Sequence, residues 1–428
     1  MILWIFSAAA RALVKLLQTF GMGGTTLPGL WIEKYMPSLV ANYAKHYHKI
    51  VFTTGTNGKT TTQSALATIL SDAGFKVVGN MSGSNMLRGI ATTLLTAGIP
   101  RSPKTVLLCE VEEATMPFLT TLAQPDIILI TNMYRDQLDA YGELDKTAEY
   151  IQKACLNCPN ALLVLNNDDP IVSSLSEALP HKKLTFSLGE DAAEFQYEGA
   201  KRNVHKSDLL VRSIIVNEDL STLSDVDIVG NRVTLTFRPP GKYNVYNALG
   251  ACAAAHALGV SNESIISALA KVEPPFGRGE TVDIRAQGKM LTFQIFLVKN
   301  PAGFSQVWNM LIDTTKATNL ILGLNDNIAD GRDVSWIWDI ILQHFTRSDI
   351  PQLISCTGTR AYDMALRLKY ADIGGTSQHI TPDISACLDN MIQKSADGRR
   401  CFVLMTYTAM NQFRVALSRY TNLSPYSL

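Results

Sequence analysis

The sequence predicts an α/β protein built around a parallel sheet, followed by a second α/β domain. Three observations lead to this prediction. Short apolar runs alternate with helix-like stretches from residue 49 to about residue 190, a Gly-rich loop follows the first run, and the alternation resumes after residue 280. Each run is almost continuously apolar, as expected of strands buried on both faces of a parallel sheet. The first part should therefore form a doubly wound nucleotide-binding domain.

The expected elements of the first domain follow the chain in order. Its apolar runs, expected to be strands, are Lys49–Thr54, Lys76–Gly79, Thr105–Glu112, Asp126–Thr131 and Ala161–Leu165. From Asp191 to Val233, mixed polar and β-branched residues without a clear period indicate antiparallel hairpins attached to that domain. Asn247–Leu258 is rich in small residues and predicts a helix that packs close to its neighbours. Pro274–Gly279 indicates a hinge or linker.

The chain after this linker predicts a second α/β domain. Its expected strands are Leu291–Leu297, Asn319–Leu324, Gln352–Thr357 and Cys401–Met405, and its expected helices include Thr359–Tyr370 and Ile384–Lys394. We therefore divide the chain into an N-terminal helical segment, a central domain and a C-terminal domain, which span residues 1–48, 49–278 and 279–428.

The N-terminal segment opens on an apolar run that Arg11 and Lys15 interrupt before it could span a bilayer. These two charges lie four residues apart, on one helical face, so we expect an amphipathic helix rather than a signal peptide. We expect the helix to pack on the protein. A helix that lies on a membrane surface stays open as the alternative.

Charge and cysteine content narrow the class of protein. The 428 residues hold 38 Lys+Arg and 38 Asp+Glu, so no net charge favours a nucleic-acid partner. A composition that is 46% hydrophobic and 18% charged is typical of a globular chain. The seven cysteines form no regular framework, and their odd number fits a reducing cytosol without disulfides.

The strongest chemical signal is a Gly-rich loop between the first strand and a helix that begins near Lys59. Its residues are Gly55, Thr56, Asn57, Gly58, Lys59, Thr60 and Thr61. The glycines allow backbone N–H groups to face a phosphate, Lys59 supplies charge for the β- and γ-phosphates, and the Thr60 hydroxyl can reach Mg²⁺. The alternative, a Gly-rich turn with a chance Gly-Lys-Thr, fits poorly between a strand and a helix.

A nucleotide site also needs a carboxylate that holds the metal at a neighbouring strand end. Glu110 is the candidate, whereas Glu112 and Glu113 fit solvated residues at a helix start. Polar residues 131–139 should lie at the carboxyl edge of the sheet, where open α/β folds bind ligands. Residues 166–170 are more typical of a turn.

Together, these motifs resemble the Mur ligases, ATP-dependent enzymes of peptidoglycan assembly. Two further segments, Gly241–Leu249 and Gly277-Arg278, belong to the same resemblance. Closer still is the MurT branch, which the sequence resembles in three long motifs: Tyr134–Glu143, Lys299–Gly303 and Asn325–Trp336. The motifs run in the expected order and cover most of the chain, so the resemblance implies a Mur ligase-like central P-loop ATPase domain and a MurT-type C-terminal domain.

The resemblance implies one half of a two-protein amidotransferase. A GatD-like class I glutamine amidotransferase subunit would release ammonia from glutamine. This chain would use ATP to amidate the α-carboxylate of D-glutamate in the stem peptide of lipid II through an acyl phosphate. The implied site is cytoplasmic, and peripheral attachment at the inner face of the membrane stays open.

The resemblance also assigns roles to residues. Lys59 and the loop amides would hold the phosphates, and Thr60 and Glu110 would hold Mg²⁺. Asn247 would lie against the adenine, and Arg278 would contact the nucleotide from the hinge. Asp333 would reach across the interface to orient the catalytic His of the glutaminase. Read without the resemblance, Asp333 is equally typical of a helix N-cap.

The sequence departs from the family in two ways. Many MurT proteins carry a four-cysteine zinc ribbon in the central domain, but Asp191–Arg238 contains no cysteine, so we expect no structural zinc. Cys155 and Cys158 have the spacing of half a zinc site without a second pair. Gln137 stands where the wider family commonly has His, so we expect a single Mg²⁺.

Two other functions remain open at this point. A stand-alone Mur or folylpolyglutamate-type ligase would use the same chemistry with an amino acid as nucleophile. A nucleotide-binding scaffold without catalysis would only recruit a partner. The cysteines favour the amidotransferase half, because none sits in the Gly-x-Cys-x-Gly elbow that class I glutaminases use, and this chain therefore needs an external source of ammonia.

Overall fold

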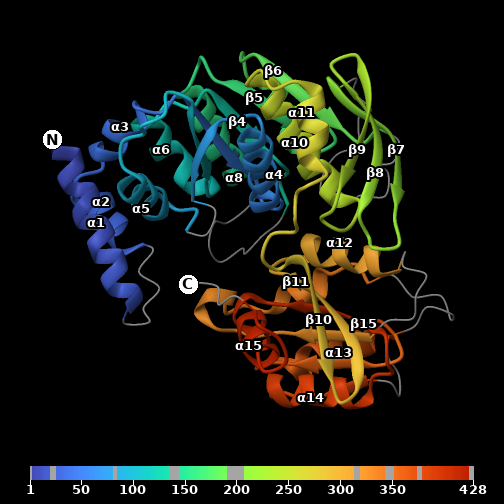
Figure 1. The fold of residues 1–428 in the computed structure, drawn as a ribbon. Helices are drawn as coiled ribbons and strands as arrows, with labels where there is room; N and C mark the ends of the chain where they lie inside the picture. The colour runs from blue at the N-terminus through green and yellow to red at the C-terminus, as the bar shows by residue number, and fades with distance from the viewer. Residues whose placement is uncertain are drawn as a thin grey trace.

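Two β-sheets organise the protein. The computed structural model describes residues 2–19, 26–80, 84–134, 144–189, 207–312, 319–342, 351–373 and 378–423. Within these residues the first sheet has nine strands in the order β2-β3-β1-β4-β5-β6-β7-β8-β9, and the second has six in the order β10-β11-β15-β12-β13-β14. Figure 1 shows the first sheet with its helices in blue to green and the second in orange and red.

The parallel part of the first sheet contains the strands expected from the apolar runs, plus one that the sequence did not indicate. Its strands are β1 (Lys49–Thr54), β2 (Lys76–Gly79), β3 (Thr105–Glu110), β4 (Ile127–Ile130), β5 (Leu162–Asn166) and β6 (Lys183–Ser187). β1 lies between β3 and β4, so the chain reverses direction across the sheet at this strand. In open parallel sheets, such a switch point opens a crevice at the carboxyl ends of the strands.

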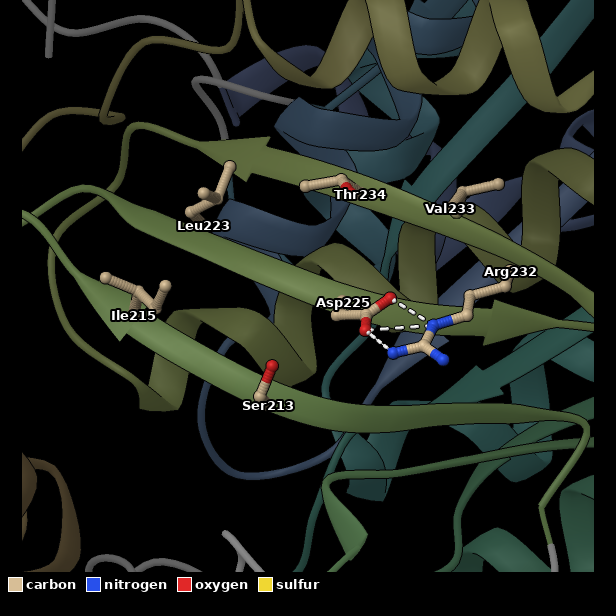
Figure 2. A pocket seen from close by; sticks show the side chains of 7 residues that line it. All are labelled: Ser213, Ile215, Leu223, Asp225, Arg232, Val233 and Thr234. Carbon is tan, nitrogen blue, oxygen red and sulfur yellow. Dashed lines mark hydrogen bonds and ion pairs between the residues drawn. The ribbon is translucent and has the colours of Figure 1, made fainter.

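The expected antiparallel hairpins extend this same sheet. They are β7 (Leu209–Val216), β8 (Thr222–Ile228) and β9 (Asn231–Phe237), with β7 parallel to β6 and antiparallel to β8. Figure 2 shows the side chains on one face of this extension, where Arg232 of β9 pairs with Asp225 of β8. Residues 190–206, the start of the expected hairpin region, lie outside the described part of the chain.

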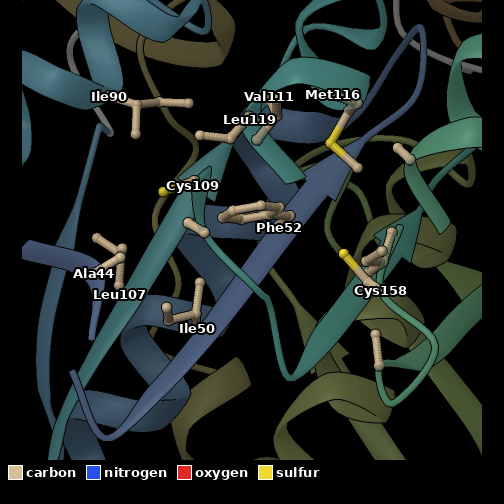
Figure 3. Close-up of a cluster of buried hydrophobic side chains, with 14 of the residues drawn as sticks. Ala44, Ile50, Phe52, Ile90, Leu107, Cys109, Val111, Met116, Leu119 and Cys158 are labelled. Carbon is tan, nitrogen blue, oxygen red and sulfur yellow. The ribbon is translucent and has the colours of Figure 1, made fainter. Parts of the chain in front are cut away.

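Helices cover both faces of the first sheet. Those that pack with it are α4 (Lys59–Asp72), α5 (Leu87–Ala97), α6 (Met116–Leu122), α8 (Leu144–Leu156), α9 (Pro170–Ala178), α10 (Tyr243–Ala257) and α11 (Asn262–Leu269). Alternate side chains of β1 enter opposite cores, because successive residues of a strand point to opposite faces. Phe52 packs with α5, α6 and α8 (Figure 3), whereas Val51 packs with α4, α10 and α11. The sheet is therefore buried on both sides, as its apolar runs predicted.

The second sheet is also mostly parallel. Its strands are β10 (Arg278–Ala286), β11 (Lys289–Leu297), β12 (Asn319–Gly323), β13 (Ile354–Thr357), β14 (Gln378–Ile380) and β15 (Arg399–Met405). The helices around it are α12 (Pro301–Ile312), α13 (Ala361–Tyr370), α14 (Ile384–Lys394) and α15 (Tyr407–Leu417), with short 3₁₀ turns η3 (Ile328–Asp330) and η4 (Ser335–Asp339). Only β10 is antiparallel to its neighbour among the described strands of this sheet.

The α/β fold class is confirmed, but the linker was drawn too long. β10 begins at Arg278, inside the expected Pro274–Gly279 linker, and its side chains alternate between buried and exposed along an edge strand. The predicted boundary between the central and C-terminal domains, after residue 278, stays a prediction. It lies next to the start of the second sheet, whose first strand begins at Arg278.

The N-terminal segment forms three helices, α1 (Ile2–Thr19), α2 (Leu27–Tyr35) and α3 (Ser38–Ala44). α1 packs against α2 and α5. Tyr43 of α3 holds the inner face of α1. Its hydroxyl donates a hydrogen bond to the Leu3 carbonyl and lies 2.8 Å from the buried Ser7 hydroxyl. The expected packing of this helix on the protein is therefore present. In the described ranges, each helix is too short or too polar to cross a bilayer.

We predict that Phe52→Ala lowers the free energy of unfolding by about 3–5 kcal/mol, because it removes a fully buried ring and leaves a cavity. Urea denaturation followed by circular dichroism measures the effect. Ile215→Ala is the control, because this side chain is mostly exposed on β7. Equal stability of the two variants would contradict the core described here.

Candidate functional site

The Gly-rich loop joins β1 to α4 in a conformation that only glycine fits at two positions. Gly55 and Gly58 have φ angles of 119° and 86°. A Cβ on Gly58 would lie 2.1 Å from Oδ1 of Asn247, and a Cβ on Gly55 would lie 2.4 Å from Oγ1 of Thr131. The glycines therefore let α10 and the end of β4 approach the loop backbone, which is the condition for backbone N–H groups to line a phosphate cradle.

The end of β4 holds this loop in shape. The Thr56 N–H donates to the Asn132 carbonyl, and the Asn57 N–H donates to Oδ1 of Asn132, each at 2.9 Å. Thr131 returns a 2.7 Å hydrogen bond from its hydroxyl to the Asn57 carbonyl. The polar segment after β4 thus reaches the carboxyl edge of the sheet as expected. Its later part, which includes Gln137, lies outside the described residues.

A buried carboxylate fixes the segment after β4 in turn. Oδ2 of Asp169 accepts the Met133 N–H at 2.7 Å, while its Oδ1 accepts the first N–H groups of α9. Burial raises the pKa of Asp169 to about 6 despite these hydrogen bonds, since desolvation disfavours the charged form. Residues 166–170 therefore form a helix cap that also supports the segment touching the loop.

Lys59, the first residue of α4, is paired with a buried carboxylate. Its Nζ lies 3.1 Å from Oε1 of Glu113, and the same oxygen accepts the Gly55 N–H at 3.1 Å. Lys59 is 5% exposed and Glu113 is 7% exposed. Burial alone would raise the pKa of Glu113, but Lys59 and the hydrogen bonds outweigh it and hold the pKa below its ordinary value. One carboxylate oxygen thus marks a position where a loop amide and a lysine converge on negative charge.

The solvated alternative for Glu112 and Glu113 is wrong. Both side chains are buried, and Glu112 accepts a hydrogen bond from the Asn85 amide at 2.5 Å. Burial raises the pKa of Glu112, and the neighbouring Glu113 raises it further, against the opposing effect of Lys59. Two adjacent acids in the sequence therefore have opposite pKa shifts, and Glu113, whose Oε1 lies 3.1 Å from Nζ of Lys59, is the one whose pKa is lowered.

Thr60 and Glu110 form the second polar pair of the site. The Thr60 hydroxyl donates to Oε2 of Glu110 at 2.8 Å. Asn80 fixes the Glu110 backbone by two hydrogen bonds of 2.8 Å. A hydroxyl and a carboxylate in contact are hard oxygen donors that fit Mg²⁺, which takes few protein ligands and completes its shell with phosphates and water. Within the described ranges, no three acidic, His or Cys side chains gather in a way that could hold a metal ion.

A cleft beside the loop is lined by residues from the two parts of the chain that form the two sheets. From the segment that forms the first sheet and its helices it takes Asn57, Gly58 and Asn247, and from the segment that forms the second sheet it takes Arg278, Lys299 and Asn300, among others. Asn57 and Asn300 exchange amide hydrogen bonds of 3.1 and 3.4 Å across it. Asn247 accepts from the Thr62 hydroxyl at 3.3 Å and donates to Asn244 at 2.7 Å. The structure therefore brings the loop, Asn247 and Arg278 together around one crevice.

Asp333 stands apart from this crevice. It is exposed on the segment between η3 and η4 and does not belong to the residues that line the cleft. Its Oδ1 accepts the Ser335 N–H at 2.8 Å, and this hydrogen bond lowers its pKa. The N-cap position of η4 is Val334, so Asp333 holds the turn that leads into η4 and is not its N-cap. This turn leaves the carboxylate ionised and accessible to a second protein.

The hollow on β7–β9 in Figure 2 has different chemistry. It is lined by Ser213, Ile215, Leu223, Asp225, Arg232, Val233 and Thr234. Its two charged residues pair with each other, and the hydrogen bond from Arg232 lowers the pKa of Asp225. Nothing in this lining resembles the phosphate cradle at the end of β1.

Several residues of the loop and of the cleft beside it had no assigned role from sequence. Glu113 is the most important, and Asn300 and Gln306 are others, since Gln306 donates to the Tyr134 hydroxyl at 3.3 Å across the two domains. The motif Lys299–Gly303 was a usable signal, because it follows β11 directly and contains polar side chains at a strand end.

Comparison with known proteins places this site in a family. Residues 53–255 match the Mur ligase middle domain, and residues 297–410 match the MurT ligase C-terminal family. Subunit MurT of the lipid II isoglutaminyl synthase (glutamine-hydrolyzing) of Streptococcus pneumoniae is 31% identical over 421 residues, which cover 92% of this chain and 92% of that protein. The subunit of the same name from Staphylococcus aureus is 27% identical over 99% of this chain and 96% of that protein.

A solved structure shares the fold. The crystal structure of MurF ligase from Thermotoga maritima in complex with ADP has a TM-score of 0.65 and 14% identity, and the match covers 89% of this chain and 82% of that one. Identity this low shows the fold alone. The resemblance inferred from the motifs is confirmed by the family matches and by the relatives' shared length.

We predict that Gly58→Ala weakens nucleotide binding at least roughly tenfold, because the added Cβ would collide with Asn247 and displace the loop. Isothermal titration with ATP and Mg²⁺ measures the affinity. Gly230→Ala is a matched control: its φ of 83° gives the same backbone strain, but its Cβ would meet open space. Equal affinity in both variants would contradict the role of this close approach.

Proposed function

Because the chain belongs to the MurT family of the Mur ligases, which are ATP-dependent carbon–nitrogen ligases, we propose that it is the synthetase subunit of a two-protein amidotransferase. Its substrate would be lipid II, the substance named for the relatives, and its product would carry D-isoglutamine in place of D-glutamate. The single observation that carries the proposal is the convergence of Lys59, the Gly55 N–H and the Thr60–Glu110 pair at one strand edge.

The reaction needs this convergence because a carboxylate is a poor acyl donor. Its leaving group would be an oxide, so the carboxylate must first attack the γ-phosphorus of ATP and release ADP, which gives an acyl phosphate. Ammonia then attacks the carbonyl carbon, phosphate leaves, and a proton is lost to give the amide. Phosphoryl transfer depends on positioning and charge stabilisation rather than on a protein nucleophile.

Each residue has a part in this scheme. Lys59 and the loop N–H groups of residues 55–61 would hold the phosphates, with Asn247 and Arg278 on the nucleotide side of the cleft. Thr60 and Glu110 would hold Mg²⁺, which neutralises phosphate charge when bound. Oε1 of Glu113 accepts from Nζ of Lys59 and from the Gly55 N–H. A bound phosphate would replace this carboxylate oxygen as the acceptor of both groups.

The cysteines support an external source of ammonia. Glutamine hydrolysis requires a thiolate nucleophile. All seven cysteines lie in the described residues and are buried, and burial raises the pKa of every one of them, to about 11 for Cys158, Cys387 and Cys401. Such thiols are inert. We therefore assign ammonia production to a GatD-like glutaminase partner.

The partner would dock on the second domain around Asp333. Exposed aromatic side chains lie near this segment: the ring of Trp338 in η4 makes an edge-to-face contact with that of Tyr370 in α13. Arg367, also in α13, donates hydrogen bonds to two backbone carbonyls of the η4 region. Exposed aromatic residues with an arginine are typical of the centre of a protein interface. Asp333 would then orient a His of the partner, as the third member of a triad does. Such a complex would work in the cytoplasm, at the inner face of the membrane.

We predict that Lys59→Ala abolishes amidation with either glutamine or ammonium as nitrogen source, because phosphate binding precedes both. Asp333→Asn should lower glutamine-dependent amidation by roughly 10²–10⁴-fold, the range for triad orienters, and keep most ammonium-dependent activity. Mass spectrometry of lipid II, with the two subunits present, measures both activities.

Asp383→Asn is the matched control for this experiment. Asp383 caps α14 through the Ala386 N–H, and Asp333 accepts the Ser335 N–H in the turn before η4, so each carboxylate accepts one backbone N–H at the start of a different helical element. Asn also caps helices well, so neither variant should unfold the domain. If Asp333→Asn reduced both activities equally, Asp333 would have no special role toward the glutaminase.

A further inference from the structure

Helix α1 has apolar side chains on both of its faces, although only one face packs on the protein. The inner face, which includes Ser7 and Ala10, is buried against α2, α3 and α5. The outer face carries Trp4, Ile5 and Leu16, and Trp4 is 67% exposed. A group of exposed Trp, Ile and Leu side chains on a globular protein is normally covered by a protein partner or by lipid. We therefore expect another molecule to cover the exposed apolar side chains of α1.

Helix α2 adds to the same feature. α2 packs against α1, and it exposes Leu30, Trp31 and Tyr35, the last at 59%. The rings of Trp31 and Tyr35 lie 5.6 Å apart, and Nζ of Lys34 lies over the Tyr35 ring. We define the N-terminal apolar surface as the exposed apolar side chains of these two helices: Trp4, Ile5, Leu13, Leu16, Leu27, Leu30, Trp31 and Tyr35.

The charge around this surface is strongly one-sided. The first 48 residues contain four lysines and arginines, Arg11, Lys15, Lys34 and Lys45, and one acid, Glu33, in a chain whose total charge is zero. The exposed Arg11 and Lys15 lie on α1 beside its exposed apolar residues, and α1 has no acidic residue. Positive charge next to Trp, Tyr and Leu complements an anionic lipid headgroup layer.

We propose that the N-terminal apolar surface binds the interface of an anionic phospholipid bilayer, with α1 and α2 lying in the plane of the membrane. Trp and Tyr rings favour the boundary between headgroups and acyl chains, because one end of each ring is apolar and the other is polar. The leucines would enter the acyl region, and Arg11, Lys15 and Lys34 would meet lipid phosphates.

A membrane fits this surface better than a protein partner does. The centres of protein interfaces are poor in lysine, whereas interfacial membrane helices have lysine and arginine beside Trp and Leu. In Figure 1, α1 and α2 form one edge of the molecule, and the helices and strands of the second sheet lie away from that edge. The surface would hold the enzyme on the bilayer that contains its lipid substrate. This role in the reaction rests on the proposed function, whereas membrane binding itself does not.

Vesicle flotation with the purified full chain tests the proposal without substrate or partner. We expect binding to vesicles of phosphatidylcholine and phosphatidylglycerol, at least roughly tenfold weaker binding to pure phosphatidylcholine, and loss of binding in about 0.5 M salt, which screens the attraction between the basic side chains and the anionic headgroups. The triple variant Trp4→Ser, Leu16→Ser, Trp31→Ser should lose binding to both kinds of vesicle.

The double variant Ile215→Ser, Val415→Ser is the matched control, because it removes exposed apolar side chains from β7 and α15. It should bind vesicles like the unaltered chain, and both variants should keep the same melting temperature. Absence of vesicle binding by the unaltered chain, or retention of binding by the triple variant, would overturn the proposal. Loss of the partner subunit by the triple variant, with vesicle binding intact, would assign the surface to a protein instead.

Amidation assays separate this proposal from the proposed function. The triple variant should amidate detergent-solubilised lipid II at the normal rate and vesicle-borne lipid II more slowly. If the unaltered chain failed to amidate either form, the proposed function would fail, and the vesicle result would still decide the membrane proposal.

Discussion

The buried ion pair between Lys59 and Glu113 is the interaction on which the site depends. Lys59 begins α4 and Glu113 follows β3, so the pair ties the loop after β1 to the neighbouring strand end. Removing either partner would leave an uncompensated charge in a buried place, which is strongly destabilising. The pair also keeps the lysine and the Gly55 N–H directed at a single anionic oxygen. The loop is thus preorganised for a phosphate before any nucleotide binds.

This constraint extends to the rest of the molecule through hydrogen bonds made by side chains. The end of β4 holds the loop through Asn132, and Asp169 holds the end of β4. Across the cleft, the paired amides of Asn57 and Asn300 join the loop to the second domain. A phosphate that moved the loop would therefore also shift the hydrogen bonds between Asn57 and Asn300 at the domain interface. This arrangement would suit the proposed reaction, in which an acyl phosphate would have to be enclosed and kept from water.

Much of this could be predicted from sequence, and the failures have physical reasons. β1 and the loop were predictable because a doubly buried strand and a phosphate cradle each need a distinctive run of residues. Glu113 was missed because adjacent acids look alike in sequence, and only the turn after β3 directs one of them at Lys59. The first two residues of β10, Arg278 and Gly279, were read as linker because they directly follow Pro274, Pro275 and Gly277. The amphipathic character of α1 was visible in the sequence, but which of its side chains pack on the protein depends on α2 and α5.

The central claim is that this chain supplies an activated carboxylate and a second protein supplies ammonia. The most direct measurement is mass spectrometry of lipid II after incubation with ATP, Mg²⁺, glutamine and the purified pair of subunits, and with each subunit alone. The account predicts a product lighter by about one mass unit, for carboxylate replaced by amide, with the pair only, because the chain's own thiols are inert. Amidation from glutamine by this chain alone would contradict it, as would ATP-dependent addition of an amino acid in place of ammonia.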